Sequence, residues 1–339
     1  MKIDNITNVE TSLMNWSEVI AYVESDAPAV AEGYPAIRIP GIIALDDGTL
    51  LTYNECRQGD DWSAIDVGLR RSNDGGKTWS ERQIIADGKG RNAANNPVMI
   101  PDGDTVHFLY CENYKRVFYC RSDDRGVTWS QRRELTDDLA IPFIWSVIAL
   151  GPGHGLRLQS GRLVVPIWVG FNKKRMFAHY PTVSGCIYSD DDGETWLVSE
   201  MLDLEGENLN ECAMAELPDG TLLVNIRGSK TAHCRRVSSS TDGGVTWEKP
   251  RRELQLTDPA CASGFLAVGD TLYFTNCNDP KSRVNLTLRR SADGGKTWED
   301  CLLIAEKAGY SDLCYYDGAL YVIFESEEER YIHCARIAL

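Results

Sequence analysis

The sequence lacks the excess of positive charge that nucleic-acid-binding proteins carry. Its 35 Lys and Arg residues are outnumbered by 50 Asp and Glu residues, and the formal net charge is −15. Because a nucleic-acid-binding surface is normally basic, this balance argues against a nucleic-acid partner, and it also disfavours adhesion to anionic membranes. An anionic small substrate would need a local cluster of arginines to overcome the overall field.

Long hydrophobic runs and metal-ligand spacings are also missing. No apolar stretch is long enough to span a bilayer, and residues 1–19 lack the basic start and apolar core of a signal peptide. We therefore expect a cytoplasmic location, unless a secretion signal has been removed. The eleven cysteines show no C-x-x-C or Cys/His spacing, which predicts small buried residues in a reducing compartment rather than a zinc site. His154 and His179 are expected to pack in the interior or lie in loops.

A motif of the form Ser-x-Asp-x-Gly-x-Thr-Trp, in contrast, recurs along the chain. Apolar and polar residues alternate in the segments that lead into it, as they do in half-buried strands. Successive copies are 50, 67, 51 and 51 residues apart, a period that is typical of a β-propeller when the flanks are strand-like. The five copies end at Trp79, Trp129, Trp196, Trp247 and Trp298.

A second turn motif, usually Asp-Gly between apolar strands, accompanies each repeat. Turn signals at positions 47, 102, 160, 219, 269 and 317 predict six blades of two hairpins each, one of them without the repeated motif. We therefore predict an all-β, six-bladed propeller with four-stranded antiparallel blades. It is expected to form a single domain over residues 1–339, in which approximately residues 1–30 are a lead-in that closes or flanks the propeller.

We interpret the repeated motif as scaffold. Asp and Ser side chains can bond backbone amides within a tight turn, Gly supplies a positive φ, and Trp packs under the turn. Calcium or sugar binding by the Asp is the alternative. The pattern resembles the Asp-box repeat of the sialidase (neuraminidase) superfamily, which folds as a six-bladed propeller. The longest gap between repeats fits an insertion at residues 168–180, which is either a loop over the site or a surface turn.

Three arginines stand in non-repeating contexts that match this family. Arg38 lies in Arg-Ile-Pro, Arg227 follows an Asp-Gly hairpin, and Arg283 begins Arg-x-Asn-Leu-Thr before the last Asp box. The resemblance implies that they clamp the carboxylate of a sialic acid, since a planar guanidinium can hold a carboxylate with two parallel, charge-assisted bonds. A surface ion pair is the alternative for each arginine taken singly.

The resemblance also implies a nucleophile and its base. Tyr310, in Gly-Tyr-Ser-Asp-Leu, matches the tyrosine nucleophile of sialidases, and Glu211 matches the glutamate that acts as its base. A tyrosine suits this chemistry because a carboxylate nucleophile would have to approach the carboxylate of the substrate. Glu216 lies in the same stretch, but five residues along a strand places it on the opposite face.

The general acid is expected in the loop after the first hairpin. Asp61 is the best match to the family there, and Asp60 and Asp66 are its competitors. Trp62, beside Asp61, is assigned to substrate contact, and Arg57 matches a fourth family arginine that contacts the sugar.

Two further residues are carried over from the family. Glu325 matches the glutamate that holds the first arginine in place, although a strand-end glutamate leading into a charged run is the alternative. Asn96 stands where many relatives have an aspartate that helps to bind the N-acyl group. An asparagine can still hydrogen-bond an amide or a hydroxyl there, but without charge.

These matches predict a retaining exo-α-sialidase that acts on sialylated glycans and needs no metal or organic cofactor. A trans-sialidase or an intramolecular trans-sialidase is an alternative that differs in its acceptor-side aromatic residues, for which Trp145, Trp168 and Tyr180 are candidates. A catalytically silent, sialic-acid-binding propeller is the alternative from another class. Such a protein would keep the arginines but lose the Tyr/Glu pair, whereas this sequence has both.

Overall fold

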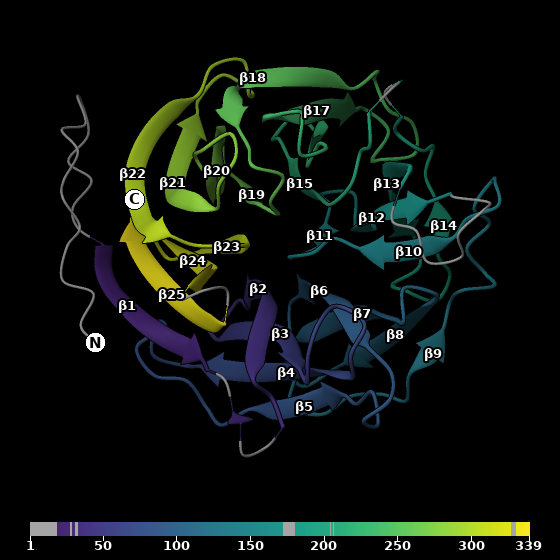
Figure 1. The fold of residues 1–339 in the computed structure, drawn as a ribbon, viewed down its shortest axis with the longest axis vertical. Helices are drawn as coiled ribbons and strands as arrows, with labels where there is room; N and C mark the ends of the chain where they lie inside the picture. Colours follow the sequence, from purple (N-terminus) through teal and green to yellow (C-terminus); the bar gives the residue numbers. More distant parts are fainter. Residues whose placement is uncertain are drawn as a thin grey trace.

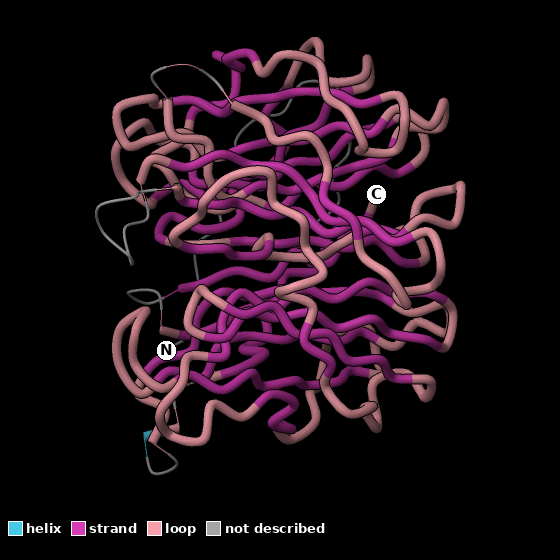
Figure 2. Tube along the Cα trace, turned by 90° about the vertical axis from the view of Figure 1, so that its right-hand side faces the viewer, coloured by secondary structure: helices cyan, strands magenta, loops and turns pink. Residues whose placement is uncertain are grey.

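The fold is a ring of six antiparallel sheets around a central axis (Figure 1). The computed structural model describes residues 19–27, 29–30, 33–171, 180–203, 205, 207–326 and 330–339, and within these ranges there is no α-helix. The predicted all-β, six-bladed propeller is therefore confirmed. Seen from the side, the loops gather at the two faces of the disc (Figure 2).

The first three blades follow one another along the chain. Blade 1 consists of β2 (Ala36–Ala44), β3 (Leu50–Arg57), β4 (Ile65–Ser72) and β5 (Gln83–Ala86). Blade 2 consists of β6 (Ala94–Asp102), β7 (Thr105–Glu112), β8 (Arg116–Ser122) and β9 (Arg133–Glu134). Blade 3 consists of β10 (Val147–Leu150), β12 (Leu163–Gly170), β13 (Thr182–Ser189) and β14 (Leu197–Val198), with the short β11 (Leu156–Arg157) as a fifth strand paired to β12.

The last three blades complete the ring. Blade 4 consists of β15 (Cys212–Glu216), β16 (Leu222–Ile226), β17 (Cys234–Ser240) and β18 (Arg251–Thr257). Blade 5 consists of β19 (Gly264–Val268), β20 (Thr271–Cys277), β21 (Val284–Ser291) and β22 (Glu299–Lys307). Blade 6 consists of β23 (Ser311–Tyr316), β24 (Ala319–Ser326) and β25 (Tyr331–Ala338), and its outer strand is β1 (Val19–Asp26) from the other end of the chain.

The pairing of β1 with β25 joins the two ends of the chain in one sheet (Figure 1). It also explains why blade 6 has no Asp box. In the other blades the box connects the third strand to the fourth, but in blade 6 these two strands belong to opposite ends of the chain. Residues 1–18 of the predicted lead-in lie outside the described residues.

Each Asp box is a tight turn held by its own side chains. In the first box, Ser72 Oγ accepts the Gly76 N–H at 2.9 Å, and Asp74 accepts the Thr78 N–H at 3.0 Å and its hydroxyl at 2.6 Å. These bonds lower the pKa of Asp74 to about 2. The same contacts recur in the other boxes, so the motif behaves as the predicted scaffold.

The axis contains a polar contact among apolar strands. His154 Nδ1 lies 2.8 Å from Asp312 Oδ1, and Asp312 Oδ2 accepts the Ile42 N–H at 3.1 Å, which ties blades 3, 6 and 1 together. His154 is thus a packed residue, as predicted. His179 and most of the predicted 168–180 insertion lie outside the described residues. The eleven cysteines are all buried and free, as expected.

Candidate functional site

A cavity of about 150 Å³ lies where loops and strand ends from all six blades converge. Eight of the ten site residues predicted from the sequence line it, and the two others, Trp62 and Glu325, do not. The predicted residues in the lining are Arg38, Arg57, Asp61, Asn96, Glu211, Arg227, Arg283 and Tyr310. Residues separated by up to about 270 positions are therefore brought to one place by the closure of the ring.

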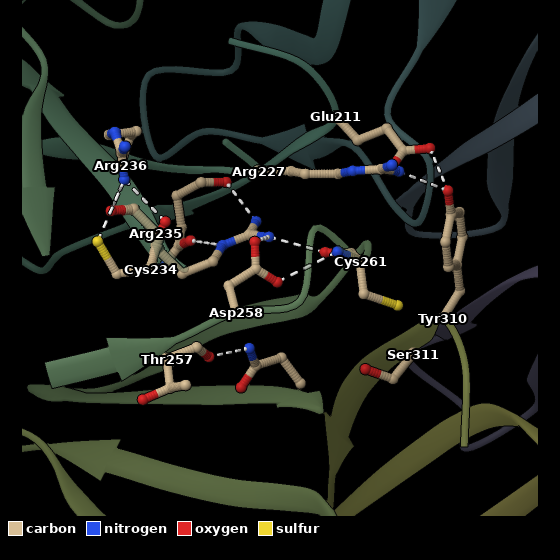
Figure 3. A network of polar contacts seen from close by, with 12 residues as sticks. Glu211, Arg227, Cys234, Arg235, Arg236, Thr257, Asp258, Cys261, Tyr310 and Ser311 are labelled. Carbon is tan, nitrogen blue, oxygen red and sulfur yellow. Dashed lines mark hydrogen bonds and ion pairs between the residues drawn. The ribbon is translucent and has the colours of Figure 1, made fainter. Parts of the chain in front are cut away.

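The Tyr310 hydroxyl lies between a carboxylate and a guanidinium group (Figure 3). Its hydroxyl donates to Glu211 Oε1 at 2.7 Å and accepts from Arg227 Nη1, also at 2.7 Å. Arg227 also forms an ion pair with Glu211 Oε2. Glu211 precedes β15 and Arg227 follows β16, so the hairpin of blade 4 sets these two side chains next to each other.

The protonation of Tyr310 is set by its surroundings. Burial raises the pKa of its hydroxyl, the nearby Arg227 and Arg283 lower it, and Glu211 raises it, with a net upward shift. The phenol is therefore neutral at rest, and it can become an effective nucleophile only if its proton passes to a base in direct contact. Glu211 is in that position.

Two further arginines flank the ring of the same tyrosine. The guanidinium carbon of Arg38 lies 5.4 Å from the centre of the Tyr310 ring, and that of Arg283 lies 5.0 Å from it. Four arginines and two carboxylates, Asp61 and Glu211, line the cavity, so guanidinium groups outnumber carboxylates at its surface. Guanidinium groups that face a cavity can bind an anionic ligand with charge-assisted hydrogen bonds.

Glu325 lies behind the cavity and organises its wall. It accepts Arg38 Nε at 3.1 Å and Nη2 at 3.0 Å, and it also accepts the backbone N–H groups of Ile39 and Tyr310 at 2.9 Å each. Burial acts to raise the pKa of Glu325, but Arg38 and these two N–H groups outweigh it, and the pKa is lowered. One carboxylate therefore fixes both a cavity arginine and the backbone of the tyrosine.

A buried glutamate that the sequence interpretation missed, Glu55, has the same role on the other side. It accepts Arg57 Nε at 2.7 Å and the Asn96 N–H at 2.8 Å, which joins blade 1 to blade 2. Arg57 Nη1 also contacts Asp61 Oδ1 at 2.5 Å. Spacing could have identified Glu55, because residues two apart on a strand point to the same face.

Asn96 presents an acceptor to the cavity. It lies in an irregular part of β6 with a φ of 52°, and its side-chain nitrogen donates to the Leu150 carbonyl at 3.1 Å. Its amide oxygen can accept a hydrogen bond from a ligand, and the same nitrogen has a second hydrogen to donate. This oxygen accepts hydrogen bonds, as an aspartate would, but carries no charge.

The competing carboxylates are engaged elsewhere. Asp66 accepts the Tyr34 hydroxyl at 2.5 Å and the Gly88 N–H at 2.7 Å, whereas Asp60 accepts the Trp62 N–H at 2.9 Å. Neither lines the cavity, and Asp61 does. Glu216 accepts the Gln159 N–H at 2.8 Å and is likewise absent from the lining, as predicted for the opposite face.

Three aromatic residues also line the cavity, beside its polar residues. Tyr114, which the sequence interpretation missed, lies in the lining with Trp168 and Tyr180, two of the three aromatic residues that the sequence could not place. The Trp62 ring is 5.0 Å from the Tyr114 ring, so Trp62 supports the lining from outside. The third unplaced residue, Trp145, instead packs against the hydrophobic core of blades 2 and 3.

In the part of the chain that the structure describes, no group of three or more His, Cys, Asp or Glu side chains is arranged to hold a metal ion. Within the same ranges, no helix is long and apolar enough to cross a membrane.

The family model of the BNR repeat-like domain matches residues 48–322. A sialidase from Bacteroides fragilis is 30% identical over 86% of this chain and 60% of its own length, and one from Micromonospora viridifaciens is 29% identical over 82% and 47%. The chain thus spans about half to three fifths of these relatives. Among solved structures, the Hadza microbial sialidase Hz136 is 27% identical with a TM-score of 0.82, covering 92% of this chain and 68% of that one.

A more distant structure has the same fold. The intramolecular trans-sialidase from Ruminococcus gnavus is 16% identical with a TM-score of 0.74, and the match covers 91% of this chain and 96% of that one. The matched family model covers most of the chain, the relatives are sialidases, and the ring of six blades agrees with both. The chain therefore belongs to the BNR repeat-like family, within the sialidase superfamily.

Proposed function

We propose that this protein is a glycoside hydrolase, a retaining exo-α-sialidase that releases terminal α-linked sialic acids from glycoconjugates. The observation that carries the proposal is the Tyr310 hydroxyl, held at 2.7 Å from both Glu211 and Arg227 in a cavity lined by four arginines. A neutral phenol in contact with a carboxylate base is the arrangement that an activated tyrosine nucleophile requires.

The arginines account for the proposed substrate. Sialic acids carry a carboxylate on the anomeric carbon, and guanidinium groups bind carboxylates with paired, charge-assisted bonds. Arg38, Arg227 and Arg283 come from three different blades, and they surround Tyr310. A carboxylate held by all three would place the anomeric carbon near the tyrosine oxygen. The small volume, about 150 Å³, favours a terminal sugar over an internal one.

The reaction then divides into two displacements. Asp61 donates a proton to the leaving oxygen while the Tyr310 oxygen bonds to the anomeric carbon and its proton passes to Glu211. Water next attacks the tyrosyl-linked sugar, with Asp61 as base, and the phenol regains its proton. Two inversions give overall retention. The arginines stabilise the carboxylate as positive charge develops on the ring.

NMR of the products that the protein forms from sialyllactose tests this proposal. A retaining hydrolase should release free sialic acid whose initial configuration is α. An anhydro or transferred sugar would instead indicate the trans-sialidase alternatives, for which Trp168 and Tyr180 at the cavity are the supporting residues. Binding of sialyllactose with no product would indicate the silent propeller.

Asp61→Asn should show a strong dependence on the leaving group. We expect kcat/KM for sialyllactose to fall by about 10²–10⁴-fold, because its alcohol leaving group needs a proton. The kcat/KM for a nitrophenyl sialoside should fall far less, because its leaving group is stable as an anion. Asp60→Asn is the matched control and should remain within a few-fold of wild type for both substrates. Equal losses on the two substrates in Asp61→Asn would contradict the assignment of the general acid.

A further inference from the structure

The loop of residues 258–263, which connects β18 of blade 4 to β19 of blade 5, is buried throughout although it has no regular secondary structure. Most loops run over the surface, because a buried loop needs partners for its backbone polar groups. Ala260 also has a φ of 63°, in the left-handed region that an alanine rarely adopts. The conformation of this loop is therefore imposed by its surroundings.

One buried ion pair supplies partners for both backbone groups of Cys261, in the middle of the loop. Arg235 Nη1 donates to the Cys261 carbonyl at 2.8 Å, and Asp258 Oδ1 accepts the Cys261 N–H at 3.2 Å. Arg235 Nη1 also lies 3.3 Å from Asp258 Oδ2, and both side chains are almost completely excluded from solvent. The backbone of Cys261 is thus held by the two partners of one ion pair (Figure 3).

Arg235 also joins this loop to the strand that leads to Arg227. Its Nε donates to Asn225 Oδ1 at 2.6 Å, and its Nη2 donates to the Asn225 carbonyl at 3.3 Å. Asn225 lies on β16, two residues before Arg227. One guanidinium group therefore holds the loop next to the strand whose arginine contacts the Tyr310 hydroxyl.

The side chain of Cys261 is packed with the tyrosine. A single buried apolar cluster contains Ile39, Cys261, Ala262, Cys277 and Tyr310. Figure 3 shows Cys261 between Asp258 and Tyr310. Glu325 fixes the backbone N–H of Tyr310, but the direction of the ring depends on the side chains against which it packs. A displaced loop would therefore let the ring tilt and carry its hydroxyl away from its two partners.

We infer that the Arg235–Asp258 pair positions Tyr310, because it holds Cys261 against the ring and so keeps the hydroxyl in contact with Glu211. Neither Arg235 nor Asp258 lines the cavity, so both act through Cys261 and not on the substrate. Removing two charges from water offsets much of their mutual attraction, so the pair is expected to contribute to this geometry more than to stability. The effect on turnover rests on the proposed function, whereas the effect on the position of the phenol does not.

Asp258→Asn tests the pair. The carboxylate accepts from Arg235 through one oxygen and from Cys261 through the other, whereas an amide has only one oxygen to offer. We expect kcat for an aryl sialoside to fall at least about tenfold, because a small displacement of a reacting group is costly. The Kd of a sialic-acid analogue should stay within about threefold, because the cavity arginines are unchanged. An unchanged kcat in this variant overturns the inference.

Asp26→Asn is the matched control. Asp26 is also buried, and it accepts Arg82 through both oxygens, at 2.6 and 3.2 Å. It ends β1 and does not line the cavity. The two variants should lose stability in urea to a similar extent, but kcat in Asp26→Asn should remain within about twofold of wild type. A parallel fall of kcat in both variants would mean that turnover follows stability, and the positioning role would be wrong.

Cys261→Ala shows whether the pair acts through this side chain. The substitution removes one buried atom and leaves the backbone bonds in place, so it covers the case in which Asp258→Asn fails to fold. We expect kcat to fall by about threefold to tenfold, and an unchanged kcat contradicts the inference. In the Cys261→Ala background, Asp258→Asn should cost less than about threefold more, because residues that act through one contact are not additive. Fully additive losses would exclude this route.

The position of the phenol can also be followed by NMR without substrate, with an isotope label on Cζ of the tyrosines. The Tyr310 signal is identified by its absence in Tyr310→Phe, and it reports the hydrogen bonds of the hydroxyl. It should move in Asp258→Asn and in Cys261→Ala and stay in place in Asp26→Asn. A signal that stays in place in the first two variants refutes the positioning role, whatever the activity. A signal that moves in a protein that releases no sialic acid supports the positioning role and refutes the proposed function alone.

Discussion

Tyr310→Phe should lower the turnover of an aryl sialoside by at least about 10³-fold, while a sialic-acid analogue continues to bind. The substitution removes one oxygen, which donates to Glu211 and accepts from Arg227. Without this oxygen, the first displacement, in which the tyrosine bonds to the anomeric carbon, cannot occur. The arginines that would bind the carboxylate remain, so the loss should appear in kcat rather than in the affinity for the analogue. Steady-state kinetics and calorimetry measure the two quantities.

Two companion variants make this result specific. Tyr315 lies on β23, the strand that Tyr310 immediately precedes, but it lines a different cavity, so turnover in Tyr315→Phe should match the wild type. Glu211→Gln keeps a hydrogen-bonding group beside the phenol but cannot take its proton, and it should also lose most of its turnover. Wild-type-like turnover in Tyr310→Phe would exclude the tyrosyl mechanism.

The architecture could be predicted because it repeats. Five of the six blades repeat the same turn chemistry at a period near fifty residues, so Trp79, Trp129 and the later copies give several independent indications of one unit. The turn count also predicts one blade without the box, and in the structure this is blade 6. Its cause, the pairing of β1 with β25, is a contact between chain ends that local sequence patterns do not encode.

The site was predictable where one residue carries a motif, and not where the contact is between blades. Arg38 and Tyr310 stand in recognisable contexts, whereas Tyr114 has no such context and reaches the cavity through the packing of blade 2. Glu55 was missed although its spacing from Arg57 was visible, because a buried glutamate gains its meaning only from Asn96 in the next blade.

Glu325→Gln should destabilise the protein by about 3–5 kcal/mol at pH 7, which would be the largest stability change predicted for a single site residue. The carboxylate is fully buried and accepts from Arg38 and from two backbone N–H groups. An amide can accept through its oxygen only, and its nitrogen would face donors, so the partly buried charge of Arg38 would be poorly compensated. Urea unfolding compares the variant with wild type. Glu306→Ala, at an exposed position of β22, is the control and should stay within about 0.5 kcal/mol.

The pH dependence of this difference separates an ionic role from a packing role. Because the pKa of Glu325 is lowered in the folded state, its charge stabilises the fold at pH values above the unfolded pKa, near 4.5, and this contribution is lost as the pH falls through the folded pKa. The gap between wild type and Glu325→Gln should therefore be widest at pH 7 and narrower at about pH 3. Other carboxylates titrate in both proteins and cancel in the comparison. A gap that is the same at both pH values would mean that the shape of the side chain, and not its charge, holds Arg38 and Tyr310 in place.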